Sequence, residues 1–246
     1  MKQMKLFLVA LLTVVMGVSV TSCMNGENNP IQPLNTFVRY DGYSAFKMAD
    51  GTKLVPKDNS STILLSAGMY IINSQYNQDE VVANSPVAID LLSTPVKIDG
   101  PSVTEQEITP DAALFALNYQ GAYPLFFDET TLIIPCLMWA KGSTSAEVAE
   151  DAKKHILTLS YEAIEEGATE LVLHLTDQIT SNKEDKRTVL NVEYKAYDLS
   201  SAISRFGGKL KKIIIKAKVN SQSNKVDDET YTKDDKYEID YSKIAK

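Results

Sequence analysis

The chain has 246 residues, of which 44% are hydrophobic and 23% charged, and its 25 Lys and Arg stand against 32 Asp and Glu. This composition is that of a folded protein, and it excludes a disordered or collagen-like chain. The net charge of −7 disfavours a nucleic-acid binder, because such a protein needs a basic surface to displace counterions from phosphates. With two His and two Cys, the chain offers few side chains for metal binding, thiol nucleophiles or imidazole bases.

The N-terminus has the pattern of a cleaved export signal. Lys2 and Lys5 precede an uncharged and largely apolar run over 6–20, which is short for a membrane span of about 20 residues. The run ends in Val20-Thr21-Ser22-Cys23, which resembles the lipobox of bacterial lipoproteins. In that family of signals the Cys sulfur is acylated and the chain is cut before the Cys. We therefore expect residues 1–22 to be a signal peptide and Cys23 to be the lipid attachment site. The alternative is an ordinary signal that is cut nearby, with an incidental Cys.

Processing at Cys23 changes the charge and the thiol content of the protein. The net charge becomes −9, because Lys2 and Lys5 leave with the signal. Acyl chains on Cys23 anchor the protein to a membrane, and we assign 23–36 to the lipidated Cys and a polar tether that contains two prolines. Cys136 is then the only thiol left, in an apolar stretch that predicts a buried side chain without a disulfide partner.

Residues 37–101 are predicted to form a small OB-like β-barrel. Short β-rich runs separated by turn residues occur at 37–48, 62–66, 69–76, 87–92 and 96–98. Asp50-Gly51 between two such runs predicts a hairpin, because Gly accepts a positive φ. About five strands in this length suit a small barrel, and the break at 99–102 marks the expected domain boundary.

Residues 102–246 are predicted to form an antiparallel β-sandwich, which makes the whole chain all-β. The runs 156–161, 171–176, 189–197 and 213–219 alternate apolar and polar residues with period two. In 189–197 the apolar face carries Leu190, Val192, Tyr194 and Ala196, and the opposite face carries Asn191, Glu193 and Lys195. In 213–219 the lysines around the apolar face predict a solvated surface rather than a basic binding patch.

Two short helices interrupt the β pattern, and the C-terminal tail leaves two alternatives open. Thr144 and Glu147 have the spacing of a capping box before a helix over 146–154, and 199–206 predicts one or two further helical turns. The tail 226–246 is either an edge strand or partly disordered.

The lipobox, the polar tether, the Phe37-Val38-Arg39 opening strand and the Asp50–Pro56 turn together resemble the NigD-like lipoproteins of Bacteroides and their relatives. This resemblance covers nearly the whole mature chain. It implies an N-terminal OB-type barrel followed by a C-terminal β-sandwich, and it brings no catalytic residues. The family name comes from an operon linked to a bacteriocin, so the resemblance also implies an immunity-type role as an alternative, and fold-level analogy does not establish that function.

The residues that could carry catalysis are few. His174 alternates with leucines and His155 stands at a strand entrance, so we expect each to be a surface or structural histidine. A glycan hydrolase needs only two carboxylates, and Asp90, Asp128 and Glu129 are the candidates nearest to aromatic strands. The acidic residues of the tail alternate with lysines and lack the spacing of a calcium loop. We therefore predict no catalytic residues, no metal and no cofactor.

The barrel offers one candidate for ligand binding. OB-type barrels often bind oligonucleotides or oligosaccharides on one face, and Tyr40, Tyr70 and Tyr76 are candidates for a stacking platform. The alternative is that these tyrosines are packing residues of the strands.

The leading hypothesis is a non-enzymatic outer-membrane lipoprotein that serves as a β-rich adaptor for an envelope protein or a glycan. The alternatives are a bacteriocin-immunity protein and a carboxylate-dependent glycan hydrolase. The expected partners are the membrane, through Cys23, and an envelope protein or glycan, but not nucleic acid. Because Glu27 is the only acidic residue soon after Cys23, a periplasm-facing position is favoured over the cell surface.

Overall fold

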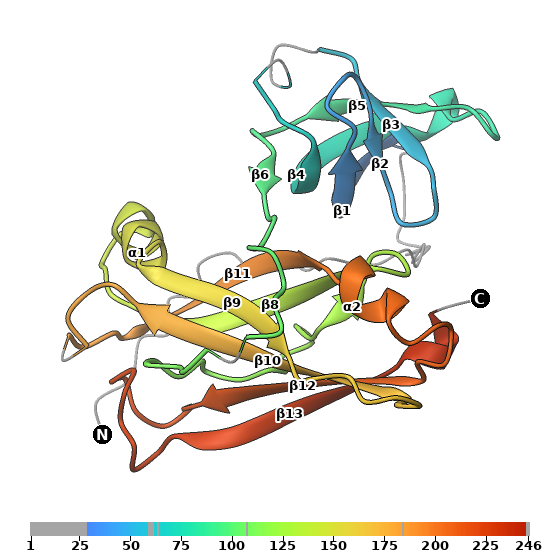
Figure 1. The fold of residues 1–246 in the computed structure, drawn as a ribbon. Helices are drawn as coiled ribbons and strands as arrows, with labels where there is room; N and C mark the ends of the chain where they lie inside the picture. The colour runs from blue at the N-terminus through green and yellow to red at the C-terminus, as the bar shows by residue number, and fades with distance from the viewer. Residues whose placement is uncertain (1–28, 59–61, 63, 107, 184, 245–246) are drawn as a thin grey trace. The chain divides into compact units, whose positions relative to one another are not determined.

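The computed structural model describes residues 29–58, 62, 64–106, 108–183 and 185–244. These residues form two compact units, one ending at Asp99 and the other beginning at Gly100 (Figure 1). The predicted signal peptide, Cys23 and the first part of the tether lie outside the described residues. Within the described ranges, no helix has the length and apolar character that crossing a membrane requires.

The first unit is a closed barrel, which confirms the predicted OB-like fold. Its elements are β1 (Ile31–Tyr40), β2 (Phe46–Lys47), β3 (Lys53–Pro56), β4 (Gly68–Asn77), η1 (Gln78–Glu80), β5 (Val87–Leu91) and β6 (Val96–Lys97). The strands follow the order β1-β2-β3-β5-β4, and β1 also pairs with β4, so five strands close on themselves. β3 and β5 are parallel, and β6 pairs with β4.

Alternating side chains of these strands fill the barrel. The buried cluster comprises Val38, Tyr40, Phe46, Leu54, Tyr70, Ile72 and Ile89. The predicted hairpin is confirmed: Gly51 has φ 89°, and its N–H donates to the Met48 carbonyl at 3.0 Å between β2 and β3. A residue with a Cβ is strained at this backbone angle, which is why the turn uses Gly.

Two details of the barrel differ from the sequence prediction. Residues 31–36, assigned to the tether, belong to β1, where Ile31 pairs with Asn77 and Thr36 with Ile72. The long partner strand β4 supplies the hydrogen bonds for this polar segment, which a local reading of its composition cannot detect. The predicted strand over 62–66 is wrong: Thr62 and Leu64 lie in turns, and Leu64 is 95% exposed.

The second unit contains two sheets and the two α-helices. Its elements are β7 (Leu125–Phe126), β8 (Thr131–Ala140), α1 (Ser145–Ala152), β9 (His155–Tyr161), β10 (Glu170–Ile179), β11 (Val189–Asp198), α2 (Ser200–Ser204), β12 (Lys212–Val219), β13 (Lys233–Asp240) and η2 (Tyr241–Lys243). One sheet has the order β13-β12-β10-β9, and the other has the order β11-β8-β7.

The predicted sandwich is confirmed, with one parallel pair. β10 and β12 run parallel, with Leu173 opposite Ile215, while the other pairs of named strands in these two sheets are antiparallel. The parallel pair arises because the chain leaves the first sheet after β10, forms β11 in the second sheet and returns through α2. The tail forms the edge strand β13 from Lys233 to Asp240. Of the two alternatives for the tail, an edge strand or partial disorder, the edge strand is therefore the one observed in this range.

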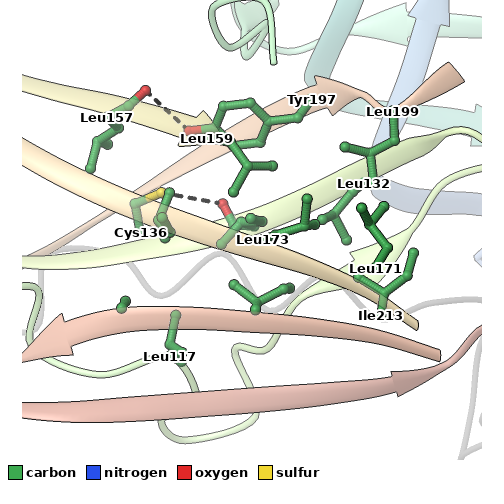
Figure 2. Packing of buried hydrophobic residues seen from close by; sticks show 14 of the residues in the cluster. Leu117, Leu132, Cys136, Leu157, Leu159, Leu171, Leu173, Tyr197, Leu199 and Ile213 are labelled. Atoms are coloured by element: carbon green, nitrogen blue, oxygen red, sulfur yellow. Dashed lines mark hydrogen bonds between the residues drawn. The ribbon is translucent and has the colours of Figure 1, made fainter. Parts of the chain in front are cut away.

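Apolar side chains of the two sheets form the core of the second unit (Figure 2). Leu132, Ile134, Cys136 and Met138 of β8 meet Leu159, Leu173 and Ile213 from the other sheet. The predicted capping box of α1 is confirmed: the Glu147 N–H donates to Thr144 Oγ1 at 3.3 Å, and the Thr144 N–H donates to Glu147 Oε2 at 3.1 Å.

The alternation of β11 is as predicted, but its apolar face does not point into this core. Leu190 and Val192 pack with Phe115 and Leu137 on the opposite side of the sheet, beneath residues 115–122. Glu193 lies directly opposite Cys136, so it shares the core-facing side. Glu193 reaches Lys195 at 3.1 Å, and both side chains are about a quarter exposed at the sheet edge, 27% and 28%. A layer from a distant part of the sequence therefore decides which face is buried.

Candidate functional site

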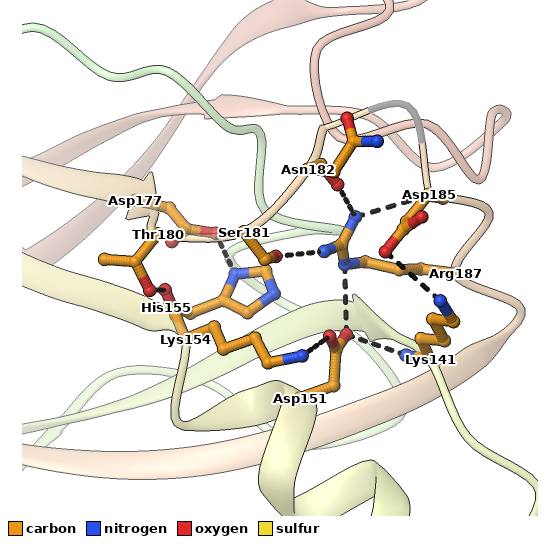
Figure 3. Close-up of polar contacts among 10 residues, drawn as sticks. All are labelled: Lys141, Asp151, Lys154, His155, Asp177, Thr180, Ser181, Asn182, Asp185 and Arg187. Carbon is orange, nitrogen blue, oxygen red and sulfur yellow. Dashed lines mark hydrogen bonds and ion pairs between the residues drawn. The ribbon is translucent and has the colours of Figure 1, made fainter.

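A group of buried polar side chains lies where β9 begins and β10 ends (Figure 3). His155 Nδ1 is 2.7 Å from Asp177 Oδ2, and both side chains are fully buried. The antiparallel register places Ile179 opposite His155, two residues beyond Asp177 on the same face. Because the side chains of β10 alternate between the two faces of the sheet, Asp177 points to the same face as Ile179, and its carboxylate reaches the imidazole of His155.

A second buried pair lies beside the first. Arg187 is completely buried, and its Nε donates to Asp151 Oδ2 of α1 at 3.0 Å. Its Nη2 donates to Ser181 Oγ at 2.7 Å, and its Nη1 donates to the Asp185 carbonyl at 3.1 Å. The guanidinium thus ties α1 to the loop between β10 and β11 (Figure 3).

The electrostatics of this cluster favour an ionised Asp151. Burial by itself would raise the pKa of this carboxyl group. The hydrogen bond from the Lys141 N–H, at 2.8 Å, and the charge of Arg187 outweigh burial, so the pKa of Asp151 lies below its usual value. A carboxylate that accepts several charged or backbone donors is stabilised in its ionised form.

The arrangement resembles part of a catalytic triad, but its contacts are structural. A triad requires a nucleophile within hydrogen-bond reach of the second ring nitrogen of the histidine. His155 Nε2 has no hydrogen-bond partner among the described residues, and the nearby Ser181 hydroxyl accepts a hydrogen bond from Arg187 instead. His155 is therefore a structural histidine, as predicted, but it lies in the interior rather than on the surface.

His174 occupies the other face of the same sheet. Its Nε2 lies 2.8 Å from Glu162 Oε1, and Lys216 Nζ lies 2.9 Å from the same oxygen. These hydrogen bonds, that of Lys216 foremost, lower the pKa of Glu162. The predicted solvated lysine face is confirmed here, because Lys212 and Lys218 are partly exposed and pair with Glu170 and Asp234.

Cys136 lies in the core of the sandwich, as expected. The thiol is fully buried, and burial raises its pKa. Sγ approaches the Ile134 carbonyl at 3.7 Å (Figure 2). A reactive cysteine needs an accessible and electropositive environment, so this thiol serves as a small hydrophobic group.

The predicted tyrosine platform is not formed. Tyr40 and Tyr70 are 3% and 2% exposed, and their rings meet edge to face at 6.2 Å inside the barrel. Tyr76 is partly buried and packs against the same cluster. Strand parity does not distinguish the inner from the outer face of a closed barrel, and here the tyrosines pack on the inner face.

The candidate carboxylates of a hydrolase have structural contacts. Asp90 Oδ2 lies 3.7 Å from Lys57 Nζ. Asp128 Oδ1 accepts hydrogen bonds from the N–H groups of Thr130 and Thr131 at 3.0 and 2.8 Å, which shapes the turn before β8. Within the described ranges, no group of three or more His, Cys, Asp or Glu is placed to hold a metal ion.

An open hollow of about 510 Å³ lies on the second unit and was not predicted. It is lined by 164–168, which connects β9 to β10, and by Arg205, Phe206, Gly207 and Lys209 after α2. Arg205 Nη1 pairs with Glu105 Oε2 at 2.7 Å, and its guanidinium lies 5.8 Å from the Tyr161 ring centroid. These segments are far apart in sequence, so only the folded chain brings them together.

Comparisons with known proteins agree with this fold. A crystal structure from Bacteroides fragilis, of a protein named as a lipoprotein, is 27% identical, covers 85% of this chain and 98% of its own, and gives a TM-score of 0.74. A protein of unknown function from Bacteroides vulgatus is 12% identical over 85% of this chain and 91% of its own, with a TM-score of 0.57.

A NigD-like immunity protein from Bacteroides caccae is 9% identical over 88% of this chain and 99% of its own, with a TM-score of 0.55. No protein-family model matches the sequence, and no curated protein matches it significantly. The expected likeness to the NigD-like lipoproteins is confirmed at the level of the fold.

Proposed function

We propose that this chain, which has the fold of the NigD-like lipoproteins of the Bacteroidetes, is a non-enzymatic outer-membrane lipoprotein. Its two β-domains, 37–101 and 102–246 as read from the sequence, present a binding surface to an envelope protein or a glycan, on the periplasmic side. The observation that carries this proposal is the likeness, over nearly the whole of both chains, to the Bacteroides fragilis lipoprotein. The lipobox at Cys23 supports it independently.

A binding role rather than a catalytic one is supported by how the reactive side chains are used. His155 is held by Asp177 in the interior, His174 is held by Glu162 on the ion-paired face, and Cys136 is buried. Each of these groups contributes to packing or to a hydrogen bond within the fold.

We place the contact surface at the hollow beside α2. It combines the apolar Ile164 and Phe206 with charged side chains of both signs on a concave surface: Glu165, Glu166, Arg205 and Lys209. Concave sites with apolar walls and a few polar groups are the usual places for ligand recognition.

The anchor is tested by metabolic labelling with a radioactive fatty acid and by fractionation of the envelope. Cys23→Ala should abolish labelling and release the protein from the outer-membrane fraction. Cys136→Ala is the matched control, because it removes the other cysteine and should leave labelling and location unchanged. Retention of the Cys23→Ala protein in the outer membrane would refute the anchor.

The contact surface is tested by a photo-activated cross-linking amino acid placed in intact cells. We expect adducts when it replaces Lys209 and none when it replaces Lys153, an exposed residue after α1. Digestion of the adduct with a peptidase or a glycosidase distinguishes a protein from a glycan. Equal adducts at both positions would exclude the hollow as the contact.

Protease treatment of intact cells reports on which side of the outer membrane the protein lies. Protection of the protein from digestion supports the periplasmic side.

The immunity role stays an alternative proposal. The relative from Bacteroides caccae carries that word in its name, and its 9% identity supports a common fold only. Deletion of the gene should sensitise the cell to a bacteriocin encoded beside it if this alternative holds. Unchanged sensitivity would favour the adaptor role.

A further inference from the structure

We infer that the end of the barrel where β1 begins rests on the membrane through a small apolar patch formed by Ile31, Val81 and Val82. This inference rests on the proposed lipid anchor at Cys23. The patch would determine which end of the barrel faces the lipid, whereas the acyl chains only hold the protein at the membrane.

Backbone contacts place the three residues of the patch at the same end of the barrel. Ile31 pairs with Asn77 at the end of β4, and the Gln78 N–H donates to the Pro30 carbonyl at 2.8 Å. The chain then continues through η1 into Val81 and Val82, and the Val81 N–H donates to the Gln78 carbonyl at 3.2 Å. Figure 1 shows the loop that carries η1 projecting from the barrel.

Each side chain of the patch is accessible to solvent. The exposed fractions are 36% for Ile31, 43% for Val81 and 64% for Val82. A single exposed apolar residue needs no explanation, whereas several at one end of a domain offer an apolar surface that a membrane can cover. Apolar side chains at a bilayer interface gain stability by burial in the boundary between headgroups and acyl chains.

The length of chain between the anchor and the patch identifies the membrane as the occupant. Ile31 follows Cys23 by eight residues, which span at most about 29 Å when fully extended. The opposite end of the barrel, next to Tyr40, lies farther away by the length of β1, about 30 Å at about 3.4 Å per residue. A lipidated Cys23 therefore limits the distance of the patch from the bilayer to about 29 Å.

The charges around the patch specify the kind of lipid. Asp79 and Glu80 stand directly before Val81. Lys57 Nζ lies 3.3 Å from Glu80 Oε2 and 3.7 Å from Asp90 Oδ2, so the acidic charge near the patch exceeds the basic charge. An acidic margin repels anionic headgroups. The patch accordingly suits a neutral phospholipid surface, and its attraction to the bilayer is apolar.

The test uses the full lipidated chain on vesicles of phosphatidylcholine and phosphatidylethanolamine. A fluorophore is attached to Val82→Cys, and the matched control is Tyr43→Cys, an 88% exposed residue in the loop after β1. Cys136 is buried and Cys23 carries lipid in this preparation, so labelling is specific. Nitroxide-labelled phosphatidylcholine then quenches fluorophores that touch the bilayer.

We expect strong quenching at position 82, none at position 43, and a reduced effect at 82 when Val81→Glu is added. Exchange of part of the lipid for phosphatidylglycerol should not increase quenching. If the protein floats with the vesicles but position 82 is quenched no more than position 43, the inference is overturned and the anchor stands. If the protein does not float with the vesicles, the anchor itself fails, and the inference fails with it.

Discussion

His155 Nδ1 and Asp177 Oδ2 lie 2.7 Å apart with both side chains fully buried, in a protein whose only other histidine is on the ion-paired outer face of the sheet. Buried polar pairs of this kind are costly to break, because the remaining partner loses its hydrogen bond without regaining water. The pair therefore couples β9 to β10 energetically as well as geometrically.

This coupling predicts a non-additive double-mutant cycle. His155→Leu should lower the free energy of unfolding by about 3 kcal/mol, because it leaves the Asp177 carboxylate buried without a partner. The double variant His155→Leu with Asp177→Leu should recover much of this loss, because both polar groups are then replaced by apolar ones. Urea unfolding followed by circular dichroism measures all four proteins. Additive losses would contradict the coupling.

Acid stability should depend on Asp151. Its pKa lies below the usual value in the folded protein, so its contribution is complete above the unfolded value of about 3.9 and is lost as the pH falls through the folded pKa. Asp151→Asn should therefore be less stable at pH 7 by about 3 kcal/mol, since Arg187 stays buried without its carboxylate, and should lose less stability on acidification. Urea midpoints between pH 7 and strongly acid pH check this, with the exposed Glu166→Gln as the control. An unchanged acid slope in Asp151→Asn would rule out this role.

Gly100 should not tolerate a side chain. A Cβ at this position would lie 2.6 Å from Cε1 of Tyr197, a fully buried ring whose hydroxyl donates to the Leu157 carbonyl at 3.2 Å. Gly100→Ala should cost about 1–3 kcal/mol of stability, because a packed ring has little room to shift. The cost should largely disappear in a Tyr197→Leu background. Equal costs in the two backgrounds, measured by thermal unfolding, would show that the ring is not the obstacle.

The Cys136 thiol should be unreactive in the folded protein. Burial raises its pKa, so neither exposure nor thiolate formation favours attack on a disulfide reagent. In the Cys23→Ser protein we expect no reaction with Ellman's reagent up to mildly alkaline pH, and one equivalent after unfolding in guanidinium chloride. Tyr43→Cys in the same background is the positive control and should react at once. Rapid native labelling at Cys136 would mean that the sandwich opens.

Several local features could be predicted because short-range chemistry determines them. Asp50-Gly51 forms its hairpin because only Gly accepts the required φ, and Thr144 and Glu147 form the capping box because their spacing matches the free N–H groups of a first helical turn. The alternation in 156–161 and 171–176 likewise marks strands with one buried face. These interactions join residues that are a few positions apart, so the residue types and their spacing can be recognised in the sequence.

Other features depended on partners that are distant in the chain. The polar composition of residues 31–36 predicts a tether, whereas pairing with β4 makes them part of β1. The apolar face of β11 points away from the main core because residues 115–122 cover it. Strand parity does not say which face of a closed barrel is inside, so only the folded barrel shows that Tyr40 and Tyr70 are packing residues.

The sequence by itself therefore determined that the protein is β-rich, with two segments and a break near Asp99, and it predicts an export signal with a lipobox. Hydrophobic periodicity and turn residues carry that information because they are local. Only the tertiary structure decided which faces are covered, that His155 and Arg187 lie in the interior, and that 164–168 and Lys209 line one hollow. The physical reason is that burial and pairing depend on which distant segments of the chain cover a residue, and its own local sequence does not specify those segments.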